Sequence, residues 1–143
     1  MPLLDVKNLK VYFPAKHGAF SRARDFVKAV DDVSFTIAPG ETLGLVGESG
    51  CGKTTLGRAI VRLVELTAGS ILFEGENLAQ LNGATLRARR RNVQMIFQDP
   101  YGSLNPRMTV ADIIAEALDI HGLVDTQSAR QKQIAELLQA VGL

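Results

Sequence analysis

The sequence has little of what secreted, membrane-spanning or nucleic-acid-binding proteins normally carry. A single cysteine, Cys51, rules out an internal disulfide and fits a reducing compartment. No apolar run reaches the roughly 18 residues of a spanning helix, and the N-terminus lacks the basic flank and apolar core of a signal peptide. The net charge is only +1, whereas general nucleic-acid binders carry a clear basic excess. These absences favour a cytoplasmic protein whose connection to any membrane runs through a partner.

Histidine is also scarce, which limits metal and nucleophile chemistry. His17 and His121 lie far from each other and from Cys51 in the sequence. A zinc site needs clustered ligands, and a catalytic thiol needs a neighbouring base. We therefore predict neither, and interpret all three residues as bystanders.

The N-terminal part of the chain has the pattern of an antiparallel β lobe. The 143 residues are 46% hydrophobic and 22% charged, which fits one globular domain with a sizeable core. Residues 3–13 and 27–37 are rich in Val, Leu, Tyr and Phe and are predicted as strands. Pro, Gly, Ser and basic residues over 14–26 indicate a loop or hairpin tip, and Pro39-Gly40 indicates a turn.

A strand–loop–helix unit is predicted next. The short apolar run of 41–47 is typical of a buried central strand. A helix is predicted from Lys53 to about Leu66, with Gly69 as its stop signal and an apolar face of Leu56, Ile60, Leu63 and Val64. The remaining elements expected are a strand over 70–74 closed by Gly75, a short helix near 85–91, a strand over 93–97, a loop over 99–108, and helices near 110–121 and 128–141.

The strongest signal is a phosphate-binding loop between the predicted strand and helix. The pattern G-x-x-x-x-G-K-[ST] is matched without exception by Gly47, Glu48, Ser49, Gly50, Cys51, Gly52, Lys53 and Thr54. Glycines let the backbone adopt positive φ and fold around phosphate oxygens. Successive N–H groups then form an anion nest, which the positive end of the following helix reinforces.

The side chains of this loop predict Mg-ATP as the ligand. Lys53 would place a cation between the β- and γ-phosphates. Thr54 would supply a hydroxyl ligand to Mg²⁺, and Thr55 would donate to the α-phosphate. Cys51 is interpreted as a small residue whose N–H alone contacts phosphate.

Together with Phe97-Gln98-Asp99-Pro100 further on, this loop resembles that of the ATP-binding cassette (ABC) ATPases. The stretch from Gln94 to Val110, with Ser103-Leu104-Asn105-Pro106-Arg107 in it, is similar to the dipeptide and oligopeptide importers of bacteria. Lys10 to Pro14 and the segment Gly40 to Gly52 resemble the second of the two ATPase subunits in those importers. The resemblance extends over the whole chain.

The resemblance implies further site residues. Phe13 would stack on adenine, with Tyr12 as the alternative, against the plain interpretation of both as packed strand residues. Gln98 would be the Q-loop glutamine that reaches Mg²⁺ or the attacking water and acts in catalysis together with Lys53. The loop Tyr101–Met108 would lie near a permease helix, with a solvated loop as the alternative. The basic run Arg87–Arg91 is interpreted as a solvated helix face.

The resemblance also implies an incomplete domain. The sequence contains no Ser-Gly-Gly signature run, no apolar strand ending in Asp-Glu and no switch histidine. We expect residues 1–98 to form the β lobe and phosphate-loop core, and 99–143 to form the Q-loop and the start of a helical subdomain. A chain of this extent would grip ATP but would not hydrolyse it competently alone.

The function implied is that of an ATP-binding subunit which drives uptake of di- or oligopeptides across the bacterial inner membrane. It would work at the cytoplasmic face with a second, homologous ATPase subunit, two permease subunits and, indirectly, an external substrate-binding protein. A non-transport ABC ATPase and a nucleotide-binding module without hydrolytic activity are the alternatives. The transported compound is left open, because the permease and the binding protein select it.

Overall fold

A computed structural model describes residues 1–15, 25–99, 102 and 104–143 of the chain. These residues divide into two compact units, Met1–Met95 and Ile96–Leu143, which are treated separately below. Within the described residues, no helix is both long and apolar enough to cross a membrane. The greater part of the predicted tip over 14–26, and with it His17, lies outside the described residues, as do Pro100, Tyr101 and Ser103.

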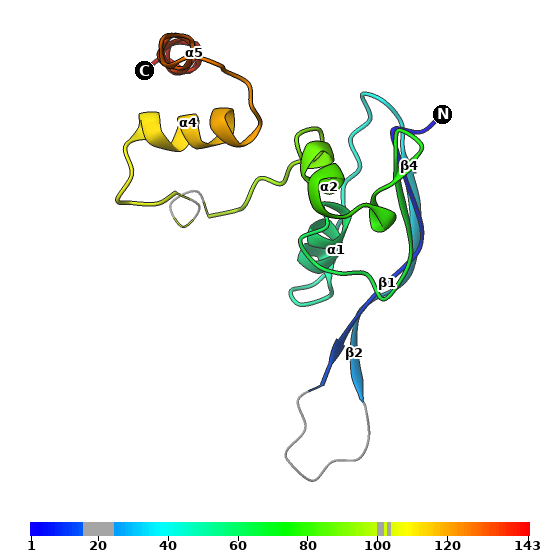
Figure 1. Cartoon of the computed structure of the whole chain (residues 1–143). Coiled ribbons are helices and arrows are strands. Elements are labelled where there is room, and N and C mark those ends of the chain that lie inside the picture. The colour runs from blue at the N-terminus through cyan, green and yellow to red at the C-terminus, as the bar shows by residue number, and fades with distance from the viewer. Residues whose placement is uncertain (16–24, 100–101, 103) are drawn as a thin grey trace. The chain divides into compact units, whose positions relative to one another are not determined.

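The first unit is built on an antiparallel sheet, which confirms the predicted β lobe (Figure 1). The strand order is β2-β1-β3-β4. The strands are β1 Leu4–Pro14, β2 Phe26–Ile37, β3 Ala68–Phe73 and β4 Glu76–Asn77. β1 therefore lies in the middle, with β2 and β3 each antiparallel to it.

One face of this sheet carries the core of the unit. Alternating residues of β1 are buried, because successive strand side chains point to opposite faces. They pack with Val30 of β2, Ile71 of β3 and Leu56 and Ala59 of the first helix. The largest fully buried side chains are Leu9, Ile71, Val6 and Val11.

The pairing of β1 with β2 is interrupted by bulges, and one of them matters for the site. Val11 pairs with Val30, but the next residue, Tyr12, pairs with Lys28. Ala29 is thus an extra residue on β2 with no partner on β1. An extra residue bends the bulged strand and re-aims its neighbours.

Helix α1, Lys53–Ile60, packs against the core face of the sheet through Leu56 and Ala59 (Figure 1). It is shorter than predicted, since Val61 is its C-terminal cap. Arg62 follows with φ 57, a left-handed conformation that ends the helix before Leu63. The prediction that the helix reaches Leu66 is wrong for this reason.

Gly69 is not a helix stop but a strand residue at a close contact. It belongs to β3 and has φ +98. A Cβ built there would lie 2.7 Å from the Cα of Leu9 and 2.5 Å from the carbonyl oxygen of Asn8. Only glycine lets β3 approach β1 this closely.

Two predicted strands are wrong, 41–47 and 93–97. Neither segment is a strand in the structure, and neither belongs to the described sheet. In the segment 41–47, Leu45 and Val46 are 52% and 90% exposed, so the predicted burial is wrong as well. In the segment 93–97, Ile96 is 96% exposed. A strand needs a hydrogen-bonded neighbour, and the described residues supply none to either segment.

The first unit is completed by the short elements η1, Leu78–Gln80, and α2, Gly83–Arg90. α2 confirms the short helix predicted near 85–91. Within its basic run, Arg89 forms ion pairs with Glu74 and Glu76. Arg90 donates to the carbonyl oxygen of Arg62 at 2.6 Å, whereas Arg87 is exposed. The run is therefore solvated in part, and two of its arginines tie α2 to the rest of the first unit.

The second unit contains the two helices expected near 110–121 and 128–141. They are α4, Val110–Ile120, and α5, Gln127–Ala140, packed through Ala115, Leu118 and Ile134. Each begins after a threonine whose hydroxyl accepts a backbone N–H of the first turn: Thr109 for α4 and Thr126 for α5.

Candidate phosphate-binding site

The loop Gly47–Gly52 has the backbone that its glycines predict. Gly47, Gly50 and Gly52 have φ 154, 82 and 98 respectively. The N–H of Cys51 donates to the carbonyl of Glu48 at 3.3 Å, which closes a turn inside the loop. The φ values of Gly50 and Gly52 lie in the left-handed region, where a side chain would add strain.

Lys53 folds back over this loop. Its ammonium donates to the carbonyl oxygens of Gly47 at 2.8 Å and of Glu48 at 2.6 Å. An ammonium has three N–H donors. Among the described residues, its third neighbour is the Sγ of Cys51, a weak acceptor at 3.5 Å. The cation is therefore fixed at the mouth of the loop with one donor available to an anion.

The N-terminus of α1 meets the end of this loop without being neutralised by the protein. Its capping residue is Gly52, which offers no side-chain acceptor, and its first turn contains no acidic residue. The N–H groups of a first helical turn have no partner inside the helix. Together with the positive end of the helix dipole, they suit a phosphate group.

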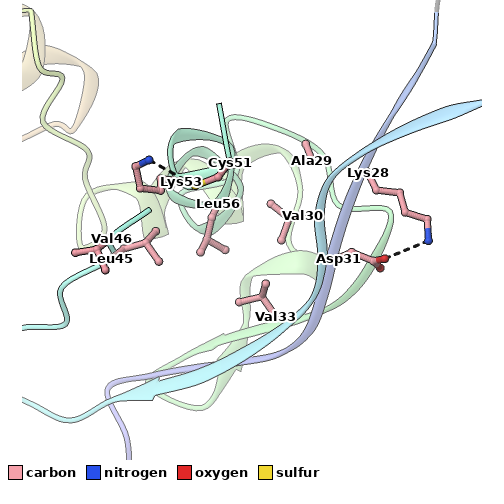
Figure 2. A pocket seen from close by; sticks show the side chains of 11 residues that line it. Lys28, Ala29, Val30, Asp31, Val33, Leu45, Val46, Cys51, Lys53 and Leu56 are labelled. Carbon is pink, nitrogen blue, oxygen red and sulfur yellow. Dashed lines mark hydrogen bonds and ion pairs between the residues drawn. The ribbon is translucent and has the colours of Figure 1, made fainter. Parts of the chain in front are cut away.

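Two pockets adjoin the loop. One, of about 320 Å³, is lined by Gly50–Thr55 together with Val27, Lys28 and Ala29 of β2. Thr54 and Thr55 both reach it, as their predicted roles require. The other, of about 390 Å³, lies between Leu45, Val46, Leu56 and the core face of β2. Figure 2 shows the second pocket, with Val30 pointing toward Leu56 and Lys53 folded beside Cys51.

The two candidate aromatics for base stacking lie on opposite faces of β1. Phe13 shares the face of buried Val11, is 40% exposed and pairs with Val27, which lines the loop pocket. Tyr12 points to the other face, where its hydroxyl donates to Asp31. The arrangement favours Phe13, whose ring is on the side of the loop, as the stacking aromatic.

Tyr12 belongs to a charged cluster on the outer face. Lys28 donates to Asp31 at 3.1 Å, and its ammonium lies 5.4 Å from the centre of the Tyr12 ring. The hydrogen bond from Tyr12, followed by that from Lys28, lowers the pKa of the Asp31 carboxyl. The same bond to Asp31 raises the pKa of the Tyr12 phenol. Lys10 adds a second cation, 3.7 Å from Asp31.

Gln98 belongs to the second unit and is exposed. Its predicted contact with Mg²⁺ or water therefore stays a prediction. Glu48 and Ser49 lie in the loop, where Glu48 contributes its carbonyl to Lys53. Cys51 is exposed, and no cluster of His, Cys, Asp and Glu among the described residues could hold a metal ion.

Val27, Lys28 and Ala29 line the pocket at the loop, but the sequence analysis did not predict them as site residues. A signal for it exists in the spacing of apolar residues on β2. Val33, Phe35 and Ile37 follow a step of two residues, whereas Val27, Val30 and Val33 follow a step of three. An extra residue within a strand pattern is the mark of a bulge.

With this geometry established, comparison with known proteins identifies the family. A family model described as ABC transporter matches residues 30–143. The chain belongs to the ABC transporter family. The resemblance found in the sequence is thus confirmed at family level.

The ABC family members most informative here are importers. The oligopeptide transport ATP-binding protein OppF of Bacillus subtilis is 57% identical over 99% of this chain. The glutathione import ATP-binding protein GsiA of Pectobacterium atrosepticum is 51% identical over 99% of this chain. The chain spans 44% and 23% of these two relatives respectively, so it matches less than half of either.

Solved ABC structures share the fold. The dimeric structure of MJ0796, a bacterial ABC transporter cassette, matches 95% of this chain at a TM-score of 0.74 and 24% identity. The chain covers 56% of that cassette. A second structure of the same cassette, with the same scores, is a post-hydrolysis state bound to ADP and Pi. The fold class predicted from sequence, part of an α/β phosphate-loop ABC ATPase, is confirmed.

Proposed function

We propose that this chain is the nucleotide-gripping part of an ABC importer subunit that couples ATP binding and hydrolysis to uptake of di- or oligopeptides. The observation that carries the proposal is the position of Lys53. Two loop carbonyls at 2.8 and 2.6 Å hold its ammonium beside the open N-terminus of α1. A cation and a set of free amides at one point suit a triphosphate better than any uncharged ligand.

The remaining roles in the site follow from the loop. The amides of Gly47 to Thr55 cradle the phosphates, Thr54 and Gln98 hold Mg²⁺, and Phe13 stacks on the base. Peptide import is supported by the names of the oligopeptide and glutathione import relatives. The partners proposed are a second ABC ATPase subunit, two permease subunits and, indirectly, a substrate-binding protein. The complex would sit at the inner face of the bacterial membrane, and hydrolysis is proposed for the full-length protein.

The experiment is a Mg-ATP titration of the full-length protein and its Lys53→Ala variant. Removing the ammonium takes away one charge-assisted contact to phosphate, which is worth about 1.5–3 kcal/mol. We expect affinity to fall by roughly 10- to 150-fold. Gly40→Ala is the matched control, because Gly40 lies in a turn outside the loop with nothing within 4 Å of an added Cβ. Equal affinity of Lys53→Ala and the unchanged protein would refute the proposal.

A co-purification experiment tests the transport part separately. Full-length protein isolated from its own membranes should carry permease subunits and no nucleic acid. Recovery with nucleic acid and without permease would assign it to a non-transport ABC ATPase instead.

A further inference from the structure

The outer face of the β1–β2 hairpin carries a cluster of polar side chains that have no role in the proposed contacts with ATP. Tyr12, Lys28 and Asp31 contact one another there, with Lys10 nearby. Figure 2 shows Lys28 and Asp31 joined on the side of β2 away from Leu56 and Lys53. Lys28 and Asp31 still line the pockets at the loop, but their charged ends meet on the outer side of β2.

The cluster lies directly over the Ala29 bulge. Lys28 precedes Ala29, Asp31 follows it by two residues, and Tyr12 is the partner of Lys28 on β1. Contacts from Tyr12 and Lys28 to one carboxylate therefore bridge the strand across its extra residue. The bridge restrains a point of β2 at which the extra residue has no ladder partner on β1.

On the opposite face, the same bulge touches the phosphate loop. A Cβ built on Gly52 would lie 2.1 Å from the carbonyl oxygen of Ala29 and 3.3 Å from its carbon. The backbones of β2 and of the α1 N-terminus are thus in direct contact. Val27, Lys28 and Ala29 also line the pocket at the loop. A shift of the bulge toward Gly52 would therefore meet the backbone of the loop.

We propose that Tyr12, Asp31 and Lys28 form a positioning cluster that holds the Ala29 bulge against Gly52 and so keeps the phosphate loop in its ATP-binding shape. Tyr12 is then a positioning residue, not the aromatic that stacks on adenine. The inference rests on the proposed function, because it concerns the same loop.

The test compares Mg-ATP affinity and ligand-free melting temperature in the full-length protein. Tyr12→Phe keeps the ring and deletes only the hydroxyl. We expect about fivefold weaker binding, equivalent to about 1 kcal/mol, with the melting temperature nearly unchanged. Steady-state hydrolysis should show a higher KM at the same kcat, since the loop is misplaced before the nucleotide binds and is restored once it is bound.

A double-variant cycle shows whether the hydroxyl acts through the carboxylate. Asp31→Ala alone should weaken binding at least as much as Tyr12→Phe. The double variant should bind no more weakly than Asp31→Ala, because the second change removes a partner that is already lost. Asp5→Asn is the matched control: it breaks another ion pair of β1, in which Asp5 lies 2.9 Å from Lys7, away from the bulge.

Three results would count against the cluster. Tyr12→Phe binding within twofold of the unchanged protein overturns the inference, while a loss in Lys53→Ala leaves the proposed function standing. Additive losses of Mg-ATP affinity in the double variant also overturn it. So does a loss of ATP binding that is fully accounted for by a loss of folded protein. If Lys53→Ala binds normally, ATP is not held by this loop, and the proposed function falls first.

Discussion

Substituting Gly52 by alanine tests the contact between the Ala29 bulge and the phosphate loop, on which the further inference depends. Gly52 has φ +98, where an L side chain costs about 1–2 kcal/mol. The added Cβ would also lie 2.1 Å from the backbone oxygen of Ala29, which no rotamer change can relieve. Inserting a methyl group into a packed contact costs a further ~1–3 kcal/mol. Gly52→Ala should therefore cost about 2–5 kcal/mol, a large share of the 5–15 kcal/mol typical of a domain.

Gly40→Ala separates the two contributions. Gly40 also has positive φ, at +77, but nothing lies within 4 Å of its added Cβ. It should cost only the conformational part, about 1–2 kcal/mol. The difference between the variants, about 1–3 kcal/mol, then measures the overlap with Ala29.

Native-state hydrogen exchange of the full-length protein is the appropriate assay, because it reports the opening of one region. Protection of β1 and α1 amides should fall by roughly 30-fold to several thousand-fold in Gly52→Ala, at 1.36 kcal/mol per tenfold. Mg-ATP affinity should fall in the same variant. Equal loss of protection in Gly52→Ala and Gly40→Ala would refute the reasoning, since the contact with Ala29 would then contribute nothing.

Two further predictions concern other parts of the chain. Gly69→Ala should destabilise the sheet by about 2–5 kcal/mol, because its Cβ would meet backbone of β1 at 2.5–2.7 Å; hydrogen exchange of β3 amides measures this. At the start of α4, the hydroxyl of Thr109 donates to the Asp112 carboxylate at 2.6 Å and lowers its pKa below the ordinary 3.8. A carboxyl whose pKa is depressed by folding stabilises the folded state above its unfolded pKa, and that contribution is lost as pH falls through the folded value. Exchange of α4 amides should thus speed up below about pH 4 relative to Asp112→Asn, in which this acid dependence is absent; identical pH profiles would contradict the assignment.

The sequence was sufficient to predict structure wherever the determinants are local. The β1–β2 pair follows from alternation, the loop from its glycines and lysine, and α4 from an amphipathic pattern. α5 was predicted in the same way, although its apolar face is narrow, with Ile134 as its buried residue. The end of α1 was missed, because Arg62 adopts φ 57 although it carries no turn signal. Gly69 was misinterpreted for a related reason: its role depends on β3 lying against β1, a contact distant in sequence.

The same distinction between local and long-range determinants applies to the site residues. Lys53 could be assigned from the motif alone, since its partners are carbonyls five and six residues away. Phe13 and Tyr12 could not be distinguished, because adjacent strand residues differ only in which face they occupy. Which face each ring occupies depends on where α1 packs, and only the structure shows this, with Val11 and Val30 against Leu56. Stacking of Phe13 on adenine stays a prediction.

The wrong prediction for 41–47 shows what holds the phosphate loop. An apolar run indicates that a segment tends to be buried, but a β-strand forms only where a neighbouring strand pairs with it. Leu45 and Val46 have none among the described residues, yet the loop that follows them is formed. The contacts that hold its shape in the described residues include the Cys51–Glu48 turn, Lys53 on the loop carbonyls and Ala29 against Gly52. All three are contacts within the described first unit, so disturbing the hairpin should alter the loop more than disturbing Leu45 or Val46.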